Sequence, residues 1–94
     1  MASYPALVEW DDEAGAYGVV FPDILGTVAM GNTFEEALAH AEESLRDYFE
    51  VMAEYGQDGA VVSPPSDLEA VEVPTKNTLV SIPVVSPIGQ YRAN

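Results

Sequence analysis

The strongest constraint on the fold is a long stretch, residues 33–56, in which apolar residues recur every three or four positions. Side chains at this spacing fall on one side of a helix, so the stretch predicts an amphipathic helix of roughly six turns. The predicted apolar stripe consists of Phe34, Ala37, Leu38, Ala41, Leu45, Tyr48, Phe49, Met52 and Tyr55. Such a stripe has to be packed against another apolar surface, and we expect that surface to be a sheet.

Both ends of the predicted helix carry recognisable signals. Thr33 can accept a hydrogen bond from a free backbone N–H of the first turn, and Glu36, three residues later, completes a capping box. Gly56 can adopt the left-handed conformation that a C-terminal cap requires. We therefore expect the helix to begin at Thr33 and to stop at Gly56.

The opposite side of the predicted helix is strongly acidic. It carries Glu35, Glu36, Glu42, Glu43, Asp47, Glu50 and Glu54 against a single base, Arg46. The whole chain has 16 acidic and 3 basic residues, which gives a net charge of −13. A surface of this sign repels nucleic-acid phosphates and anionic lipids, and it attracts a basic partner. The simpler interpretation is that the acids only keep a small domain soluble.

Four other segments have the composition of strands. Three precede the helix, at Tyr4–Trp10, Tyr17–Phe21 and Thr27–Met30, and the fourth follows it at Leu79–Val85. Pro83 favours an edge position or a bulge for the last strand, because proline cannot donate to a neighbouring strand. The predicted fold is therefore α+β, in the order β-β-β-α-β, with a small, mainly antiparallel sheet and the helix packed on one face.

The other face of this sheet has no predicted cover within the chain. The residues between the helix and the last strand lack periodicity and include Gly59, Pro64 and Pro65, so they predict a connector that crosses back over the sheet. Apolar strand residues would then remain open to water. We therefore expect a second copy or a partner to cover them, which predicts a homo-oligomer, either a dimer or a tetramer.

Length and composition set further limits. With 94 residues the chain has room for one domain, which we place at residues 1–85, followed by a tail at 86–94 without a recognisable DNA-binding element. The absence of cysteine excludes disulfides and thiolate metal sites and is typical of a reducing cytoplasm. No apolar run approaches the roughly 20 residues of a membrane span, so we expect a cytoplasmic protein.

An enzyme is the weaker interpretation of the acidic residues. Glu9, Asp11 and Asp23 could contribute to a two-metal nuclease site, but all three lie in or beside predicted turns rather than at a strand centre. His40, the only histidine, has no partner nucleophile in the sequence and is expected on the surface. Trp10 could anchor an interface, although a tryptophan that ends a strand favours a place in the core. We predict no catalytic, cofactor-binding or metal-binding residue.

Two segments of the chain together resemble the HicB family of antitoxins. These are YGVVFPDILG at residues 17–26 and GNTFEEALAHAEESL at residues 31–45, which match the family pattern YxVxFPDxPGxxxxGxTxEEAxxxAxEAL as a block. The resemblance extends over about residues 4–85. The chain departs from the pattern at Leu25, where proline is usual, and at Thr27, where cysteine is common.

The resemblance implies a partial ribonuclease-H-like fold without nuclease activity, acting as the antitoxin of a type II toxin–antitoxin pair. The implied partner, HicA, is a small basic toxin that cleaves mRNA with a histidine. Inhibition would occlude the toxin's RNA-binding surface, and the acidity of this chain fits such a partner. Many family members also bind their own operator through a C-terminal domain. That element is not recognisable here, so we do not expect this chain to bind nucleic acid directly. It could still contribute to the regulation of its own operon together with the toxin or another subunit.

The residues that we expect to contact the partner are acids of the predicted helix and of the turns. They are Asp11, Asp12, Glu13, Asp23, Glu35, Glu42, Glu43, Asp47 and Glu50. The alternative function is a non-catalytic, homo-oligomeric binding module of the same fold with a different basic protein partner. Both functions require an acidic binding surface, so the sequence does not separate them.

Overall fold

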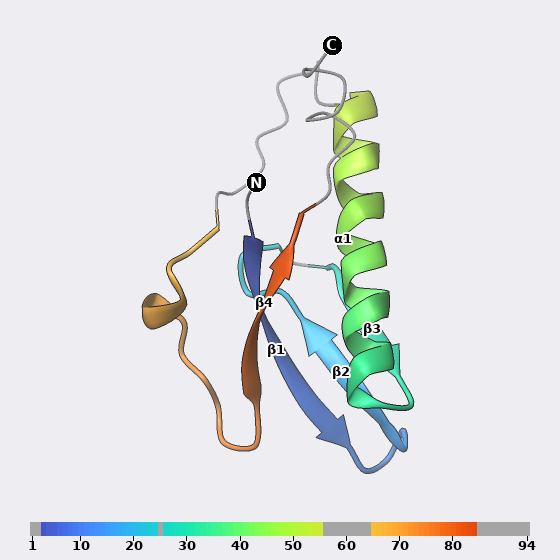
Figure 1. Ribbon diagram of the computed structural model, residues 1–94, viewed down its shortest axis with the longest axis vertical. Coiled ribbons are helices and arrows are strands. Elements are labelled where there is room, and N and C mark those ends of the chain that lie inside the picture. The colour runs from blue at the N-terminus through green and yellow to red at the C-terminus, as the bar shows by residue number, and fades with distance from the viewer. Residues whose placement is uncertain (1–2, 25, 56–64, 85–94) are drawn as a thin grey trace.

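The computed structural model describes residues 3–24, 26–55 and 65–84 of the chain. Its elements confirm the predicted order (Figure 1). They are β1 (Ser3–Asp11), β2 (Ala16–Val20), β3 (Val28–Gly31), α1 (Phe34–Tyr55), the short 3-10 helix η2 (Leu68–Ala70) and β4 (Thr78–Pro83). The predicted boundaries are correct to within two residues, except that Gly56 and Val85 lie outside the described residues.

The four strands form one antiparallel sheet in the order β3-β2-β1-β4. The hairpin between β1 and β2 closes through Gly15, whose φ of 64° is the left-handed conformation that favours glycine. Its N–H donates to the carbonyl oxygen of Asp11 at 2.8 Å. β4 pairs with β1 and forms one edge of the sheet, as predicted from Pro83.

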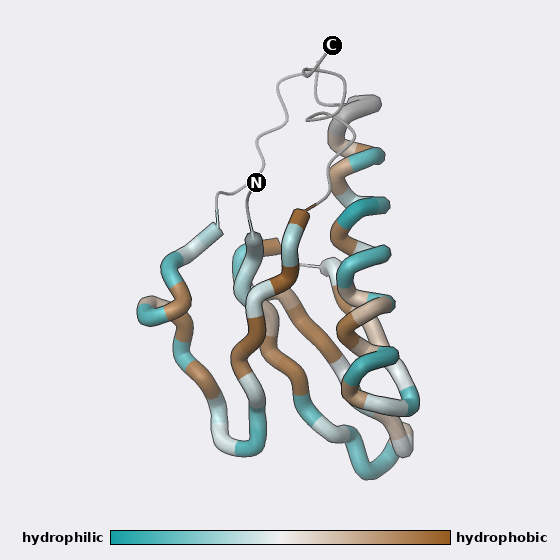
Figure 2. Tube along the Cα trace, in the orientation of Figure 1, coloured by the Kyte–Doolittle hydropathy of each residue, from teal (hydrophilic) through white to brown (hydrophobic). Residues whose placement is uncertain are grey.

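The core lies between α1 and one face of the sheet. Alternate residues of each strand point to this face, because successive side chains of a strand point to opposite sides. The core includes four side chains that are fully buried, Ala6 and Val19 from the strands and Ala41 and Leu45 from α1. In Figure 2 the hydrophobic stretches of α1 are turned toward the sheet and the hydrophilic ones away from it. The predicted amphipathic helix is therefore confirmed.

The start of α1 is fixed by side-chain hydrogen bonds. The Thr33 hydroxyl accepts the backbone N–H of Glu36 at 3.0 Å, and the Glu36 carboxylate accepts the backbone N–H of Asn32, also at 3.0 Å. In the predicted capping box the carboxylate would bind the N–H of Thr33 itself. The reciprocal arrangement is thus present, but the acid reaches one residue further back along the chain.

Gly31 allows the first turn of α1 to approach the end of β3 very closely. A Cβ atom at this position would overlap the backbone nitrogen of Ala37 and would lie 2.7 Å from its Cα. These are backbone atoms of the helix, so they cannot move aside as a flexible side chain can. α1 packs mainly on β3 and β2, and the missing side chain of Gly31 sets the distance between helix and sheet at this end.

The face of the sheet opposite α1 is partly covered by the chain itself. Figure 1 shows residues 65–77 on that side of the sheet. Ser66 donates to the Asp23 carboxylate through both its N–H and its hydroxyl at 2.7 Å, and Asn77 donates to Glu9 at 3.3 Å. Pro5 and Leu7, which point to this face, are buried. The prediction that this face lacks a cover is therefore wrong for β1.

Exposed apolar side chains on this face gather on the other half of the sheet. Val20, Val28 and Met30 are each 46% exposed or more. They come from β2 and from the edge strand β3, which the connector does not cover. The homo-oligomer expected from an open sheet face remains a prediction, and these three residues are the large hydrophobic strand residues exposed on this face among those described.

Replacing Gly31 by alanine is expected to destabilise the fold by about 1–3 kcal/mol, the usual range for overpacking a close contact. The matched control is Gly18→Ala in β2, where a Cβ atom would meet nothing within 4 Å. Urea unfolding of the two variants measures the difference. Equal stability of Gly31→Ala and Gly18→Ala would contradict the close approach of α1 to β3.

Tyr4 gives the fold a dependence on alkaline pH. Its side chain is buried, and its ring centroid lies 5.6 Å from that of Phe49. Burial first, and then the nearby charges of Asp23 and Tyr48, raise the pKa of the Tyr4 phenol above its ordinary value of 10.0. In the unfolded chain the phenol loses its proton at a lower pH, so its contribution to stability is full below pH 10 and is lost above it.

The melting temperature is therefore expected to fall as pH rises above about 10, and Tyr4→Phe should fall less steeply because it has no phenol to ionise. Thermal unfolding at neutral and alkaline pH measures this effect, and the difference between the two proteins at neutral pH provides the baseline. A variant whose melting temperature follows that of the wild type in parallel would argue against the assignment to Tyr4.

Candidate protein-binding surface

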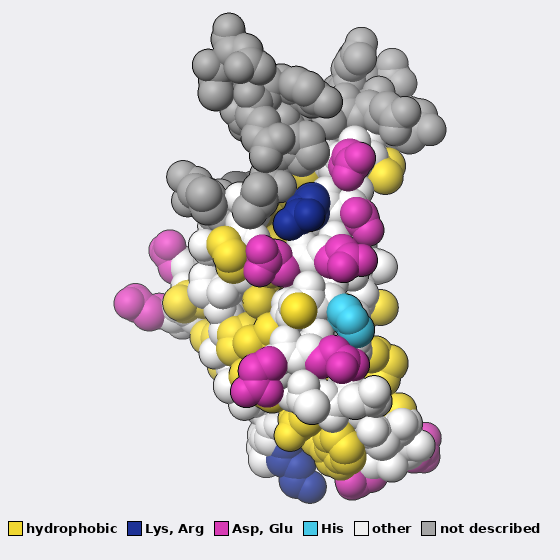
Figure 3. All heavy atoms as spheres, turned by 45° about the vertical axis from the view of Figure 1, so that its right-hand side comes forward, with side chains coloured by type: hydrophobic (Ala, Val, Ile, Leu, Met, Phe, Trp, Pro, Cys, Tyr) yellow, Lys and Arg dark blue, Asp and Glu magenta, His cyan; other side chains and the backbone are white. Residues whose placement is uncertain are grey.

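The acidic residues predicted on the helix lie on the side of α1 that faces away from the sheet. Glu35, Glu43, Asp47 and Glu50 are exposed, and Glu42 is half-buried. Helical spacing places Glu42 and Asp47 on opposite flanks of this side, with the other three between them. Figure 3 shows the resulting band of acidic side chains along the molecule, interrupted by a histidine and a basic residue. The structure thus brings the five helix acids onto one continuous surface.

The acids of the β1–β2 turn have local roles. The Asp11 carboxylate accepts the backbone N–H groups of Glu13 and Ala14 at 3.0 and 3.2 Å, so it shapes the turn. Asp12 accepts the indole N–H of Trp10 at 2.8 Å. Glu13 is exposed. This turn lies at the end of the sheet where α1 begins (Figure 1).

Asp23 acts across the fold rather than within its turn. The Pro-Asp pair in the sequence favours a turn in which the Asp23 carboxylate accepts backbone N–H groups of that same turn. In the structure its two carboxylate oxygens instead accept the N–H and the hydroxyl of Ser66, 43 residues further along the chain. Asp23 is half-buried and lies beside the connector, on a different part of the molecule from the helix acids. Nothing local in the sequence indicates this pairing, since it depends on how the connector folds back.

Trp10 is the principal residue that the sequence places wrongly. Its side chain is 45% exposed instead of lying in the core. Trp10 shares the helix-facing side of β1 with Val8, which is buried, but it lies near the end of the strand, beyond the cover of α1. Its ring packs edge-on against Tyr17 with centroids 4.9 Å apart, and Tyr17 packs on Phe34 at 5.8 Å. The predicted place in the core is therefore wrong, because the cover of α1 does not extend to the end of β1.

His40 is exposed, as predicted, and contacts the edge of the sheet. Its Nδ1 lies 2.6 Å from the carbonyl oxygen of Met30 in β3. A carbonyl only accepts hydrogen bonds, so Nδ1 carries the proton in this arrangement. No serine or threonine hydroxyl is recorded as its partner within the described residues. The contact fixes the imidazole against β3 and gives no indication of catalysis.

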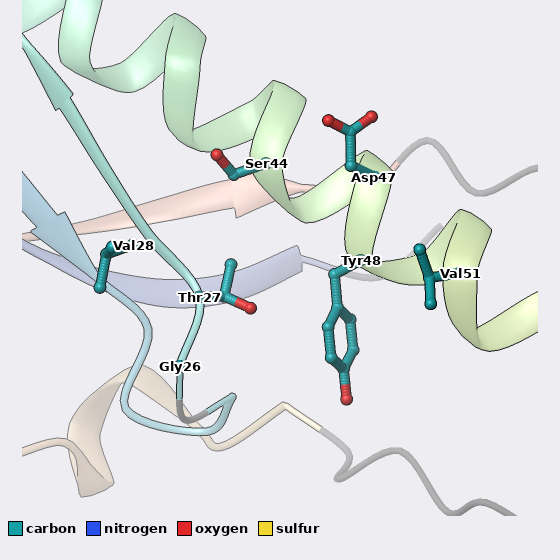
Figure 4. A pocket seen from close by; sticks show the side chains of 7 residues that line it. All are labelled: Gly26, Thr27, Val28, Ser44, Asp47, Tyr48 and Val51. Atoms are coloured by element: carbon teal, nitrogen blue, oxygen red, sulfur yellow. The ribbon is translucent and has the colours of Figure 1, made fainter.

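A shallow hollow of about 380 Å³ lies between the start of β3 and the second half of α1 (Figure 4). Its lining residues are Gly26, Thr27, Val28, Ser44, Asp47, Tyr48 and Val51. They supply three hydroxyl groups and one carboxylate, but within the described part of the chain no hydrogen bond joins the carboxylate to one of these hydroxyls. Among the described residues there is also no group of three or more histidine, cysteine, aspartate or glutamate side chains that could hold a metal ion.

The described surface has the features of a protein-binding domain: a small sheet, one helix whose outer side is acidic, and an exposed aromatic group at one end. Within the described residues no helix is long and apolar enough to cross a membrane. The family comparison agrees with this class. Residues 4–87 match the model of the HicB_like antitoxin of bacterial toxin–antitoxin systems. The chain therefore belongs to the HicB-like antitoxin family.

Solved structures support the same assignment. The chain is similar to the N-terminal domain of the Burkholderia pseudomallei antitoxin HicB, with 27% identity and a TM-score of 0.73 over 87% of this chain and 96% of that one. It is similar to a chain of the HicA3 and HicB3 toxin–antitoxin complex, with 25% identity and a TM-score of 0.66 over 87% and 96%.

A toxin–antitoxin complex from Streptococcus pneumoniae gives 25% identity and a TM-score of 0.69 over 96% of this chain and 71% of that one. The chain also spans 64% of the length of a longer structure of the Burkholderia pseudomallei antitoxin HicB, at 28% identity and a TM-score of 0.75. No curated protein sequence matches the chain. The fold is thus that of HicB antitoxins, in agreement with the predicted α+β class.

Proposed function

We propose that the chain neutralises a small basic toxin of the HicA type by binding the surface with which the toxin holds and cleaves mRNA. The observation that carries this proposal is the acidic side of α1, most of whose carboxylates have no hydrogen-bond or ion-pair partner within the described residues. Family membership supports the antitoxin role, and similar chains occur in toxin–antitoxin complexes.

The proposed mechanism is occlusion. A protein that binds RNA presents lysine and arginine side chains to phosphate groups, and carboxylates can pair with the same cations. Glu35, Glu43 and Glu50 follow the length of α1 on its outer side, as phosphates follow a nucleic-acid backbone. An acidic band also accelerates encounter with a basic protein, because opposite charges steer diffusion. Once bound, the antitoxin would exclude RNA without any chemical step of its own.

The same charge argues against direct contact between these residues and nucleic acid. With a net charge of −13, the chain would repel a phosphate backbone unless bases gathered on one face. The described residues contain only two bases, Arg46 and Lys76, which lie on different elements. We propose that any part of this antitoxin in operon regulation depends on the toxin, on another subunit or on residues outside those described.

Charge reversal on α1 tests the proposal. Glu43→Lys with Glu50→Lys should weaken binding of a HicA-type toxin about tenfold or more and make it less sensitive to salt, since two favourable charge pairs become repulsive. The control is Glu69→Lys with Glu72→Lys, which makes the same change in net charge on exposed residues of the connector. Calorimetry over a salt series and inhibition of mRNA cleavage are the measurements.

The two variants separate a specific surface from general charge attraction. The α1 variant is expected to lose inhibition of mRNA cleavage while the connector variant keeps most of it. Equal losses in both would show that only net charge matters. Unchanged affinity of the α1 variant, or affinity that does not respond to salt, would contradict the proposal that α1 provides the toxin-binding surface.

A further inference from the structure

Three aromatic side chains form a continuous row at the end of the molecule where α1 begins. Trp10 packs edge-on against Tyr17 at an interplanar angle of 69°, and Tyr17 packs on Phe34 at 90°. Tyr17 and Phe34 are half-buried, whereas Trp10 is 45% exposed. The row therefore consists of two half-buried rings and one exposed ring, that of Trp10. Figure 3 shows a hydrophobic patch at this lower end of the molecule, with a basic side chain on one side of it and acidic side chains on the other.

Each ring of the row is held in place before any partner arrives. Trp10 and Tyr17 are paired across β1 and β2, and the indole N–H of Trp10 donates to Asp12 at 2.8 Å. Phe34 opens α1, directly after the capping residue Thr33. Binding to such a surface requires little further ordering of side chains, which lowers the entropic cost of association. Exposed, immobilised tryptophan and tyrosine are the residues that most often dominate binding energy.

The charges beside the row determine which partner it fits. Asp12 touches the indole, Glu13 is exposed in the same turn, and Glu35 follows Phe34 in the first turn of α1. One base, Lys76, lies in the turn before β4, so acids remain in excess at this end. The face of an aromatic ring attracts cations, most strongly for tryptophan, and neighbouring carboxylates add to that attraction. An anionic partner would be repelled by these carboxylates, and an apolar partner would make no use of them.

We propose that the Trp10–Tyr17–Phe34 row is the anchor of the partner interface and that its open ring receives a lysine or arginine side chain of the basic partner. The identity of that partner rests on the proposed function. The exposed acids of α1 would then steer the partner and pair with further cations. The row supplies the apolar contact area that charges alone do not provide, and it lies at the same end as the acidic β1–β2 turn.

Trp10 is the only tryptophan of the chain, so its fluorescence reports directly on this surface. The experiment titrates the full chain with a HicA-type toxin whose catalytic histidine has been replaced. The emission of Trp10 is expected to change on binding, and its quenching by acrylamide to decrease at least twofold. Trp10→Ala is expected to bind at least tenfold more weakly, with circular dichroism as the check on folding.

Three further variants make the test specific. Trp10→Phe retains an aromatic face and is expected to bind more tightly than Trp10→Leu, which keeps only apolar area. The matched control is Leu68→Ala, since Leu68 is 46% exposed on η2 and its loss should leave affinity unchanged. Equal affinities of the phenylalanine and leucine variants would overturn the cation contact with the ring.

The outcomes distinguish this inference from the proposed function. A toxin that binds the wild-type chain and Trp10→Ala equally, with Trp10 still open to acrylamide, would overturn the anchor and leave the antitoxin function standing. A toxin that does not bind the wild-type chain at all would overturn the proposed function and the anchor with it. Weakened binding of Trp10→Ala together with protection of Trp10 would support both.

Discussion

The close approach of α1 to the end of β3 is the contact on which the rest of the structure depends. Because Gly31 has no side chain, the first helical turn can rest on the strand at the backbone of Ala37. The capping bonds of Thr33 and Glu36 then fix the direction in which the helix leaves. In this direction the apolar stripe of α1 covers β3 and β2, and the acidic residues of α1 face outward. The end of β1 stays uncovered.

The sequence predicts the features of this fold that depend on local patterns. Apolar spacing indicates the helix, the Thr33 cap marks its start, and glycine marks the hairpin turn, because each signal lies within a few residues of the structure it specifies. Features that depend on tertiary contacts were missed. The bond between Asp23 and Ser66 arises from a connector without periodicity, and periodicity is the signal that the prediction uses.

The acidic residues illustrate the same distinction in the candidate site. Composition and helical spacing indicate where carboxylates gather on α1, and the structure places those residues on one surface. Composition and spacing do not indicate which carboxylates already accept hydrogen bonds within the fold. Asp11 and Asp23 bind backbone and side-chain donors within the fold, and Asp12 orients an indole. An acid near a turn therefore has a structural task in this protein more often than an acid on the exposed side of the helix.

The contact between His40 and Met30 also bears on solubility. β3 is an edge strand, and edge strands offer backbone groups to which strands of other molecules can add, which is a common start of aggregation. Natural sheets often protect such an edge with a charge or a proline, and β3 has neither. Here the His40 imidazole of the neighbouring helix donates a hydrogen bond to the Met30 carbonyl oxygen of the strand. An incoming strand would have to displace it, so one helical side chain shields the least protected edge of the sheet.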